Sequence, residues 1–200
     1  IIIPVYNEAL TIGEVIVVMD SLELIDNVQK ELIVVNDAST DGSEEAITKA
    51  VAQINLKAEV ITHPVNKGKG GALHTGIQKA TGDYTIIQDA DLELNPEEIN
   101  RLIQAHLETK ADIVYGSRFL KKDQKGGSAM SNLANSFLTW LSNLVFGIKI
   151  TDMETCYKLV PTATFKSLNL VEQRFGFEPE ITAKLAKFKE LKWAEVPITY

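Results

Sequence analysis

The chain has little cysteine and a deficit of positive charge. Cys156 is its only cysteine, so no disulfide can form within the chain and no cysteine cluster can hold zinc. A single thiol fits a reducing compartment. The 27 acidic residues outnumber the 20 basic ones, which gives a formal net charge of −7. This balance argues against a general nucleic-acid-binding surface, so we expect no nucleic-acid partner.

A signal peptide is also missing. The first apolar run, residues 1–5, begins without an initiator methionine, and the chain stops at Tyr200 without a terminal cap. We therefore expect one domain that is trimmed at both ends, with any membrane anchor outside it. The apolar content of 45% and charged content of 24% are usual for a soluble globular domain of 200 residues.

Strand-like and helix-like runs alternate along the first part of the chain. Apolar runs predict strands at residues 1–5, 31–35, 59–62, 84–88 and 113–116, and later at 192–197. Helical patterns occupy residues 10–22, 43–54, 71–79 and 96–109, and later 181–188. This alternation predicts an α/β fold with a mainly parallel central sheet and helices on both faces.

The alternation breaks after Arg118. A basic loop with Lys121, Lys122 and Lys125 precedes residues 128–148, which carry no charge. Apolar residues recur there at the three- and four-residue steps of one helix face. They are Met130, Leu133, Ala134, Phe137, Leu141, Leu144, Val145 and Ile148. The segment is too polar for a membrane span, so it packs in the core, the commoner case, or lies in a membrane interface.

Two aspartates, Asp89 and Asp91, follow the fourth strand-like run. Ligands of open α/β sheets bind outside the carboxyl ends of the strands. Two carboxylates at such a point repel each other unless a cation or hydrogen-bond donors lie between them. Because Mg²⁺ binds one or two protein carboxylates together with phosphates, the pair suggests a metal that holds a nucleotide diphosphate. The alternative is a helix-capping loop, since residues 95–98 begin a helix.

Three more loops reach the same edge of the predicted sheet. After the first strand, Tyr6 could stack on a base and Glu8 could accept a ribose hydroxyl, but the glycines of a dinucleotide site are absent. After the second strand, Asp37 could accept from a base N–H. The glycine-rich residues 66–76 open a helix, which suits an anion, without the Walker spacing. Turns and caps explain each loop singly, but their joint position favours a nucleotide site.

In this order the motifs resemble the family 2 glycosyltransferases with the nucleotide-diphospho-sugar transferase (GT-A type) fold. The nearest resemblance is to polyprenyl-phosphate transferases of the dolichyl-phosphate mannosyltransferase type. The motifs are Pro4-x-Tyr6-Asn7-Glu8, Asp89-Ala90-Asp91-Leu92, Gly116-Ser117-Arg118, Asp152 with Cys156-Tyr157-Lys158, and Glu178-Pro179-Glu180. The resemblance covers residues 1–200 as a single catalytic domain, with 119–148 as an acceptor loop and amphipathic helix.

The resemblance implies roles for individual residues. The nucleoside pocket would be lined by Pro4, Tyr6, Glu8, Val35 and Asp37. Mg²⁺ or Mn²⁺ and the donor diphosphate would be held by Asp89, Asp91 and Glu93, with backbone contact from Ala90. Arg118 would face the phosphates, chiefly that of the acceptor, with help from the basic loop. The sequence departs from the family's pattern at two places. Asn36 stands where the family often has the first of two acidic residues, and the chain stops before the basic residues that in the family follow the final motif.

The implied activity is inverting and metal-dependent transfer of a sugar from a nucleotide-diphosphate sugar, of the GDP-mannose or UDP-glucose type. The acceptor would be a polyprenyl (dolichyl or undecaprenyl) phosphate at the cytoplasmic face of a membrane. Such a phosphate is already anionic and needs no strong base. For a hydroxyl acceptor, Asp152, Glu178 or Glu180 could act as the catalytic base.

Three alternatives remain from the sequence. The acceptor could be a hydroxyl group of a glycan or protein, or the chain could bind nucleotide sugars without catalysis. A sugar-1-phosphate nucleotidyltransferase is disfavoured because residues 4–8 lack glycine and arginine. Processive polymerisation is rejected, since Gln173-Arg174-Phe175 does not match the Gln-x-x-Arg-Trp motif of processive synthases.

Overall fold

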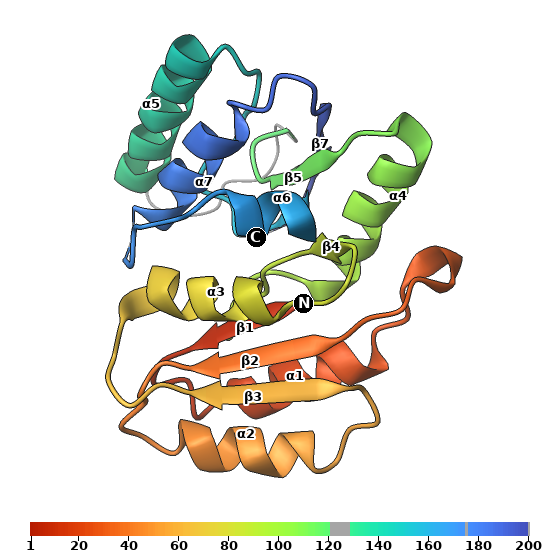
Figure 1. The fold of residues 1–200 in the computed structure, drawn as a ribbon, viewed down its shortest axis with the longest axis vertical. Helices are drawn as coiled ribbons and strands as arrows, with labels where there is room; N and C mark the ends of the chain where they lie inside the picture. Colours follow the sequence, from red (N-terminus) through yellow and green to blue (C-terminus); the bar gives the residue numbers. More distant parts are fainter. Residues whose placement is uncertain (121–128, 175, 200) are drawn as a thin grey trace.

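The computed structural model describes residues 1–120, 129–174 and 176–199 (Figure 1). Lys121, Lys122 and Lys125 of the basic loop lie outside the described residues, as does Phe175. The strands are β1 (Ile2–Val5), β2 (Leu32–Asn36), β3 (Ala58–Thr62), β4 (Tyr84–Thr85), β5 (Ile113–Ser117), β6 (Lys158–Pro161) and β7 (Trp193–Pro197). The helices are α1 (Ile12–Ser21), α2 (Ser43–Val51), α3 (Gly68–Lys79), α4 (Ile99–Thr109), α5 (Ala129–Phe146), α6 (Thr162–Ser167) and α7 (Phe177–Leu185), with short 3₁₀ turns η1 (Ile25–Asn27) and η2 (Pro96–Glu98).

The strands form two groups that one bridge connects. β1, β2 and β3 are parallel in that order, with Ile2 opposite Ile33. The second group has the order β4-β6-β5-β7, in which β5 and β7 are parallel while β6 runs antiparallel to both its neighbours. A parallel bridge between Ile2 and Ile87 joins the groups. The predicted mainly parallel α/β fold is therefore confirmed, although the antiparallel strand β6 was not expected.

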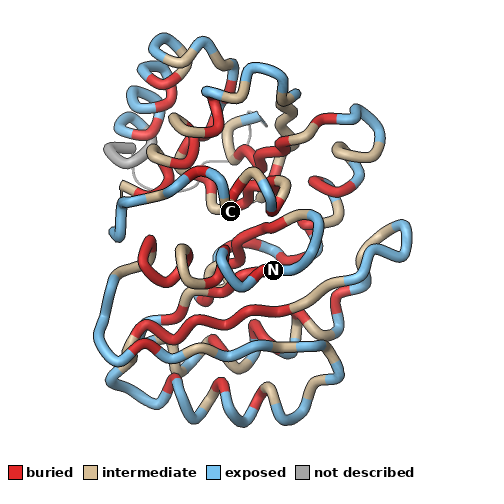
Figure 2. The backbone as a smooth tube through the Cα atoms, in the orientation of Figure 1, coloured by how far each residue is buried: buried red, intermediate tan, exposed pale blue. Residues whose placement is uncertain are grey.

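Alternate residues of the strands point into two separate apolar cores. In β2, Val34 packs into a core with α1, α2 and α4, whereas Ile33 and Val35 pack into a core with α3, α6 and α7. A strand places successive side chains on opposite faces, so strands of nearly continuous apolar residues need cover on both faces. The burial map shows this most clearly for β2, which is red along its length, while the outer sides of the helices are pale (Figure 2). The helices on both faces were correctly predicted.

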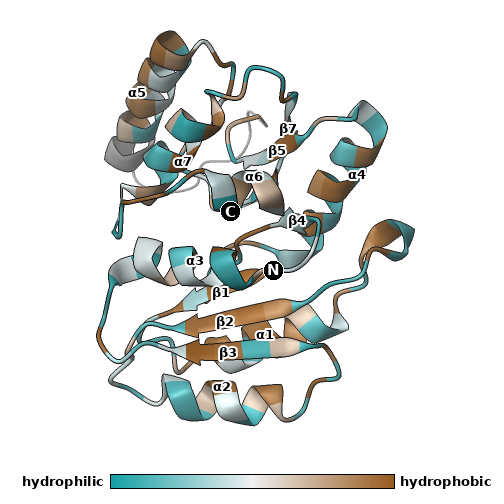
Figure 3. Cartoon of the chain, in the orientation of Figure 1, coloured by the Kyte–Doolittle hydropathy of each residue, from teal (hydrophilic) through white to brown (hydrophobic). Residues whose placement is uncertain are grey.

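Helix α5 contradicts the core-packing interpretation of its apolar residues. Leu133, Phe137 and Leu144 are 72%, 57% and 66% exposed, while Asn135 and Thr139 are 7% and 4% exposed. The helix therefore lies on the protein through its polar face and presents its apolar face outward. It is at the outer edge of the molecule, next to α7 (Figures 1 and 3). The periodicity correctly indicated a helix, but the buried side is the opposite one. Within the described residues, no helix is long and apolar enough to cross a membrane.

Candidate active site

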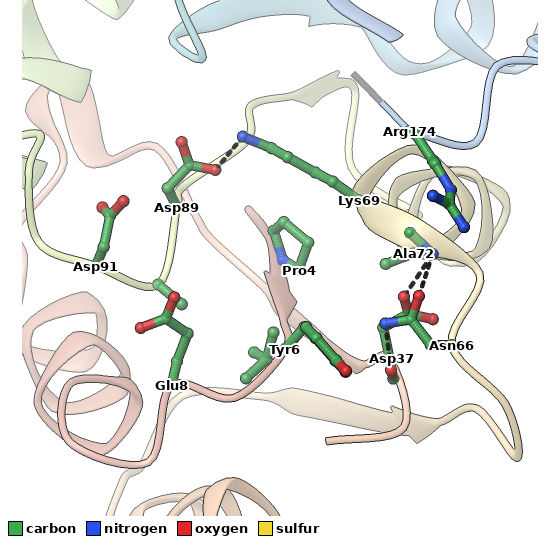
Figure 4. A pocket seen from close by; sticks show the side chains of 13 residues that line it. Pro4, Tyr6, Glu8, Asp37, Asn66, Lys69, Ala72, Asp89, Asp91 and Arg174 are labelled. Atoms are coloured by element: carbon green, nitrogen blue, oxygen red, sulfur yellow. Dashed lines mark hydrogen bonds and ion pairs between the residues drawn. The ribbon is translucent and has the colours of Figure 1, made fainter. Parts of the chain in front are cut away.

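A pocket of about 490 Å³ lies at the carboxyl ends of β1 and β2 (Figure 4). Seven of the predicted site residues line it: Pro4, Tyr6, Glu8, Asp37, Asp89, Ala90 and Asp91. The parallel strands bring these separate loops to one edge of the sheet, as the sequence predicted. Val35 is not part of the lining. It is fully buried in the core between β2 and α3, because successive side chains of a strand point to opposite faces of the sheet and Val35 points to the α3 face.

Asp37 supports the wall of the pocket. One of its carboxylate oxygens lies 2.6 Å from Nδ1 of His63, and the carboxylate accepts hydrogen bonds from the backbone N–H groups of Lys67 at 2.9 Å and Gly68 at 2.7 Å. Its side chain is only 2% exposed. Asp37 therefore lines the pocket as expected, but its hydrogen bonds fix the glycine-rich loop that begins α3.

Asp89 already has a cationic neighbour. Nζ of Lys69 lies 2.6 Å from Oδ1 of Asp89, and the thiol of Cys156 donates to Oδ2 at 2.5 Å. Burial, followed by the charge of Asp89, raises the pKa of Cys156 well above its usual value, so this thiol stays protonated and acts as a donor. The Asp89 carboxylate is thus oriented by two partners from distant parts of the chain.

Asp91 has fewer partners. It accepts a hydrogen bond from the backbone N–H of Glu93 at 3.1 Å. Desolvation by the surrounding walls raises the pKa of Asp91, and the charges of Asp89 and Glu93 add to this effect. A carboxylate whose ionised form is disfavoured in this way is stabilised by an added cation. The Asp89–Asp91 pair therefore fits a divalent metal, and the Lys69 ammonium beside Asp89 shows that the position attracts positive charge.

The expected third metal ligand does not join this pair. Among the residues that the structure describes, no group of three or more His, Cys, Asp or Glu side chains is arranged to hold a metal ion. Glu93 follows the turn after Asp91 and is not among the residues that line the pocket. A metal at Asp89 and Asp91 would need further ligands from phosphates, which is the usual coordination of protein-bound Mg²⁺.

Two cationic side chains in the pocket, Lys69 and Arg174, were not assigned to the site from the sequence. Arg174 is distant in sequence but reaches the pocket because residues 172–174 pack on the start of α3. There, Gly71 donates its backbone N–H to the carbonyl of Gln173 at 3.1 Å. A Cβ on Gly70 would lie 2.3 Å from the carbonyl oxygen of Glu172, so only glycine permits this approach. The glycine-rich loop was the available signal, but its partner segment was not visible in the sequence.

Arg118 and Asp152 form a paired unit away from the pocket lining. Nε and one terminal nitrogen of Arg118 donate to Asp152 at 2.7 and 2.9 Å, and the backbone N–H of Arg118 donates at 3.1 Å. Burial alone would raise the pKa of Asp152, but hydrogen bonds from Arg118 and its charge, with a bond from Asn135, lower it. A carboxylate with a lowered pKa is a weak base, so this geometry does not favour Asp152 as the catalytic base.

The two other acidic candidates are also engaged. Glu178 forms a buried ion pair with Lys158, whose ammonium also donates to the carbonyl of Thr155. Glu180 pairs with Lys184 at 2.7 Å and accepts from the backbone N–H of Glu172 at 2.8 Å, and its pKa is lowered against the opposing effect of burial. These pairs make both carboxylates structural in this arrangement, and neither residue lines the pocket.

Together, the α/β fold and the pocket at the strand ends define a GT-A glycosyltransferase. Residues 1–168 match the model of Glycosyl transferase family 2, and the chain belongs to this family. It is thus a sugar-transferring enzyme of the predicted family, with relatives among the polyprenyl-phosphate transferases.

One such relative is the dolichol-phosphate mannosyltransferase of Pyrococcus furiosus, with 34% identity over 121 residues, 60% of this chain and 33% of that protein. Another is the undecaprenyl-phosphate 4-deoxy-4-formamido-L-arabinose transferase of Edwardsiella ictaluri, with 26% identity over 100% of this chain and 59% of that protein. The chain thus spans less than two thirds of either relative.

The fold is shared with glucosyl-3-phosphoglycerate synthase of Mycobacterium tuberculosis, whose crystal structure contains Mg²⁺ and uridine diphosphate. The TM-score is 0.69 at 21% identity, over 99% of this chain and 68% of that one.

Proposed function

We propose that this glycosyltransferase moves a sugar from a nucleotide-diphosphate sugar to a polyprenyl phosphate at a membrane surface, with Mg²⁺ or Mn²⁺ as cofactor. The observation that carries the proposal is the pocket in which Asp89 and Asp91 meet the cationic Lys69 and Arg174. Two relatives named as polyprenyl-phosphate transferases support the acceptor class. A structural relative crystallised with Mg²⁺ and uridine diphosphate supports the donor and the metal.

On the donor side, six pocket residues have defined tasks. Tyr6, 48% exposed, stacks on the base, and Glu8 accepts a ribose hydroxyl. Asp89 and Asp91 would hold the metal, which when bound supplies Lewis-acid stabilisation of the charge that develops on the leaving diphosphate. Lys69 and Arg174 bind phosphate oxygens from the side of α3, whose N-terminus favours anions.

On the acceptor side, the lipid phosphate is the nucleophile and is already anionic. Its oxygen attacks the anomeric carbon from the face opposite the leaving diphosphate, which inverts the configuration there. Arg118 holds this phosphate, and Asp152 keeps the guanidinium oriented. No general base is required, which agrees with the ion-paired state of Asp152, Glu178 and Glu180.

The membrane part of the proposal rests on the outer face of α5. This face consists of Leu133, Phe137, Trp140, Leu141, Leu144 and Val145, each between 39% and 72% exposed. An exposed apolar patch of this kind marks an interaction surface, and an amphipathic helix with aromatic residues is suited to the boundary of lipid headgroups and chains. We place α5 on the cytoplasmic face of a membrane, where it would bring the lipid phosphate to Arg118.

Calorimetric titration with UDP and GDP, each with and without Mn²⁺, tests the donor site. We expect one nucleotide to bind tightly only with Mn²⁺, and Asp91→Asn to weaken that binding about 100-fold because a metal ligand is lost. Asp83→Asn, an exposed aspartate outside the pocket lining, is the matched control and should bind as wild type. Binding that needs neither Mn²⁺ nor Asp91 would contradict the donor-site assignment.

A transfer assay with a radioactive nucleotide sugar tests the acceptor class. We expect label to move into the organic phase when a polyprenyl phosphate is present, because the product carries a lipid chain. Label that appears only on a glycan or protein would support the hydroxyl-acceptor alternative. Nucleotide binding without release of nucleotide diphosphate would instead support a non-catalytic domain.

A further inference from the structure

The inner face of α5 carries a row of polar side chains that bond to one segment. Asn135, Thr139 and Asn143 are spaced by four residues and therefore lie on the same side of the helix. Asn143 donates to the carbonyl of Ile150 at 2.8 Å and accepts from its N–H at 3.0 Å. Thr139 accepts from the backbone N–H of Met153 at 3.2 Å. The helix is thus held to residues 150–153 by hydrogen bonds.

This row continues to the phosphate-binding arginine of the proposed function. Asn135 donates through Nδ2 to Oδ1 of Asp152 at 2.9 Å, and the same oxygen accepts from a terminal nitrogen of Arg118 at 2.9 Å. Thr139 donates to Oδ1 of Asn135 at 3.2 Å, which fixes the orientation of the Asn135 amide. The connection from α5 to Arg118 is therefore continuous, through Asn135 and Asp152.

The bond from Asn135 is suited to setting the geometry of the arginine. Asp152 is fully buried, whereas the Arg118 side chain remains 23% exposed. A carboxylate that binds a guanidinium through two nitrogens fixes its plane, provided that the carboxylate itself cannot rotate. Among the described residues, Asn135 supplies the side-chain hydrogen bond that Asp152 accepts from α5.

We propose that Asn135 is a positioning residue that acts through Asp152 to orient Arg118 for the acceptor phosphate. Because the opposite face of α5 is the apolar outer face, this contact also connects the surface that meets the lipid with the group that binds its phosphate. The inference rests on the proposed function for the role of Arg118, but it adds a residue and a connection to that function.

The test compares variants for binding of geranyl phosphate, a soluble two-isoprene phosphate, by isothermal titration calorimetry with nucleotide and Mn²⁺ present. We expect Asn135→Leu, which keeps the shape and removes the donor, to weaken binding about tenfold, as for loss of a hydrogen bond to a charged group. Asn135→Gln keeps the amide donor and should recover much of the affinity. Ser136→Ala, on the exposed side of the same helix, is the matched control.

Nucleotide binding with Mn²⁺ is the internal reference, because a general structural defect would weaken it too. Unchanged geranyl phosphate binding by a folded Asn135→Leu protein would overturn the inference and leave the proposed function standing. Absence of binding by the wild-type protein would overturn both. If Asn135→Leu does not fold, Thr139→Val takes its place, because it removes the hydrogen bond that fixes the Asn135 amide. Weaker binding of geranyl phosphate with intact nucleotide binding would support the inference. Geranyl phosphate binding equal to that of the wild-type protein would overturn it.

Discussion

Two carboxylates, Asp91 at the pocket and Asp152 in the second half of the chain, lie in opposite electrostatic environments. At the pocket, Asp91 has one backbone donor and a raised pKa. Beneath α5, Asp152 is fully buried with a lowered pKa, because Arg118 and Asn135 surround it. The first arrangement is incomplete without a cation from outside, whereas the second contains its own. In the proposed function Asp91 would bind the metal and Asp152 would support Arg118, although both residues look equally functional in the sequence.

The largest effect should come from breaking an internal pair. Lys158 is fully buried against Glu178. Lys158→Met would leave Glu178 with a buried uncompensated charge and should lower the free energy of unfolding by about 3–5 kcal/mol. Urea unfolding measures the change. Lys79→Met is the matched control, because its partner Glu59 lies 3.2 Å away in an exposed pair, which should contribute less than about 1 kcal/mol. Equal effects of the two variants would contradict the comparison.

Neutralising one aspartate in each region should change stability in opposite directions. At pH 7 without metal, Asp152→Asn should lower the free energy of unfolding by about 1–3 kcal/mol, since Arg118 loses a charged partner. Asp91→Asn should raise it, because the raised pKa shows that ionised Asp91 is disfavoured in the fold.

The pH dependence follows from the two pKa directions. The lowered pKa of Asp152 means that its contribution is complete above the unfolded pKa of about 4 and disappears as the pH falls through the folded value. For Asp91 the raised pKa means that the gain from Asn also vanishes below about pH 4, where the carboxyl is protonated in both states. Urea unfolding of both variants from pH 7 to pH 3 measures these changes. A destabilising Asp91→Asn would show that its carboxylate is already compensated.

A smaller effect is expected on the outer face of α5. The double substitution Phe137→Ser and Trp140→Ser removes two side chains that are each 57% exposed. We expect about tenfold weaker binding to vesicles of phosphatidylcholine and phosphatidylglycerol in a sedimentation assay. The free energy of unfolding should change by less than about 0.5 kcal/mol per site, because both side chains are mostly exposed and their ring contact is with each other.

Leu10→Ser is the control for vesicle binding, since Leu10 is 98% exposed but lies outside α5. A large loss of stability in the α5 variant, with unchanged vesicle binding, would show that the outer face is covered by protein in solution.

Much of the pocket lining could be predicted because these residues follow strands that are easy to recognise. Asp37 and Asp89 lie within two residues of apolar runs, and parallel strands bring such positions to one edge. Val35, also predicted for the nucleoside pocket, has its side chain in the core on the α3 side, because alternation along the strand decides which face of the sheet a side chain occupies. Arg174 could not be predicted, because its position depends on the packing of residues 172–174 against glycines of α3.

The second half was less predictable for two physical reasons. Periodicity identifies a helix and separates its polar and apolar faces, but it does not determine which face packs on the protein. In α5 the polar face does so. β6 was missed because it is short and begins with Lys158, whose charge is matched by Glu178 on α7, 20 residues later. Pairings at such separation leave no local pattern.

The polar inner face of α5 would keep the helix bound to the protein when its outer face is buried among lipid chains. Lipid chains would replace apolar contacts with the protein at little cost in free energy, so a helix held only by apolar packing could detach into the bilayer. Leaving the protein would expose the Asn135, Thr139 and Asn143 side chains to hydrocarbon without hydrogen-bond partners, at several kcal/mol for each unsatisfied polar group. If the outer face of α5 binds a membrane as proposed, the same lipid would therefore oppose release of the inner face, and the helix would stay on the protein.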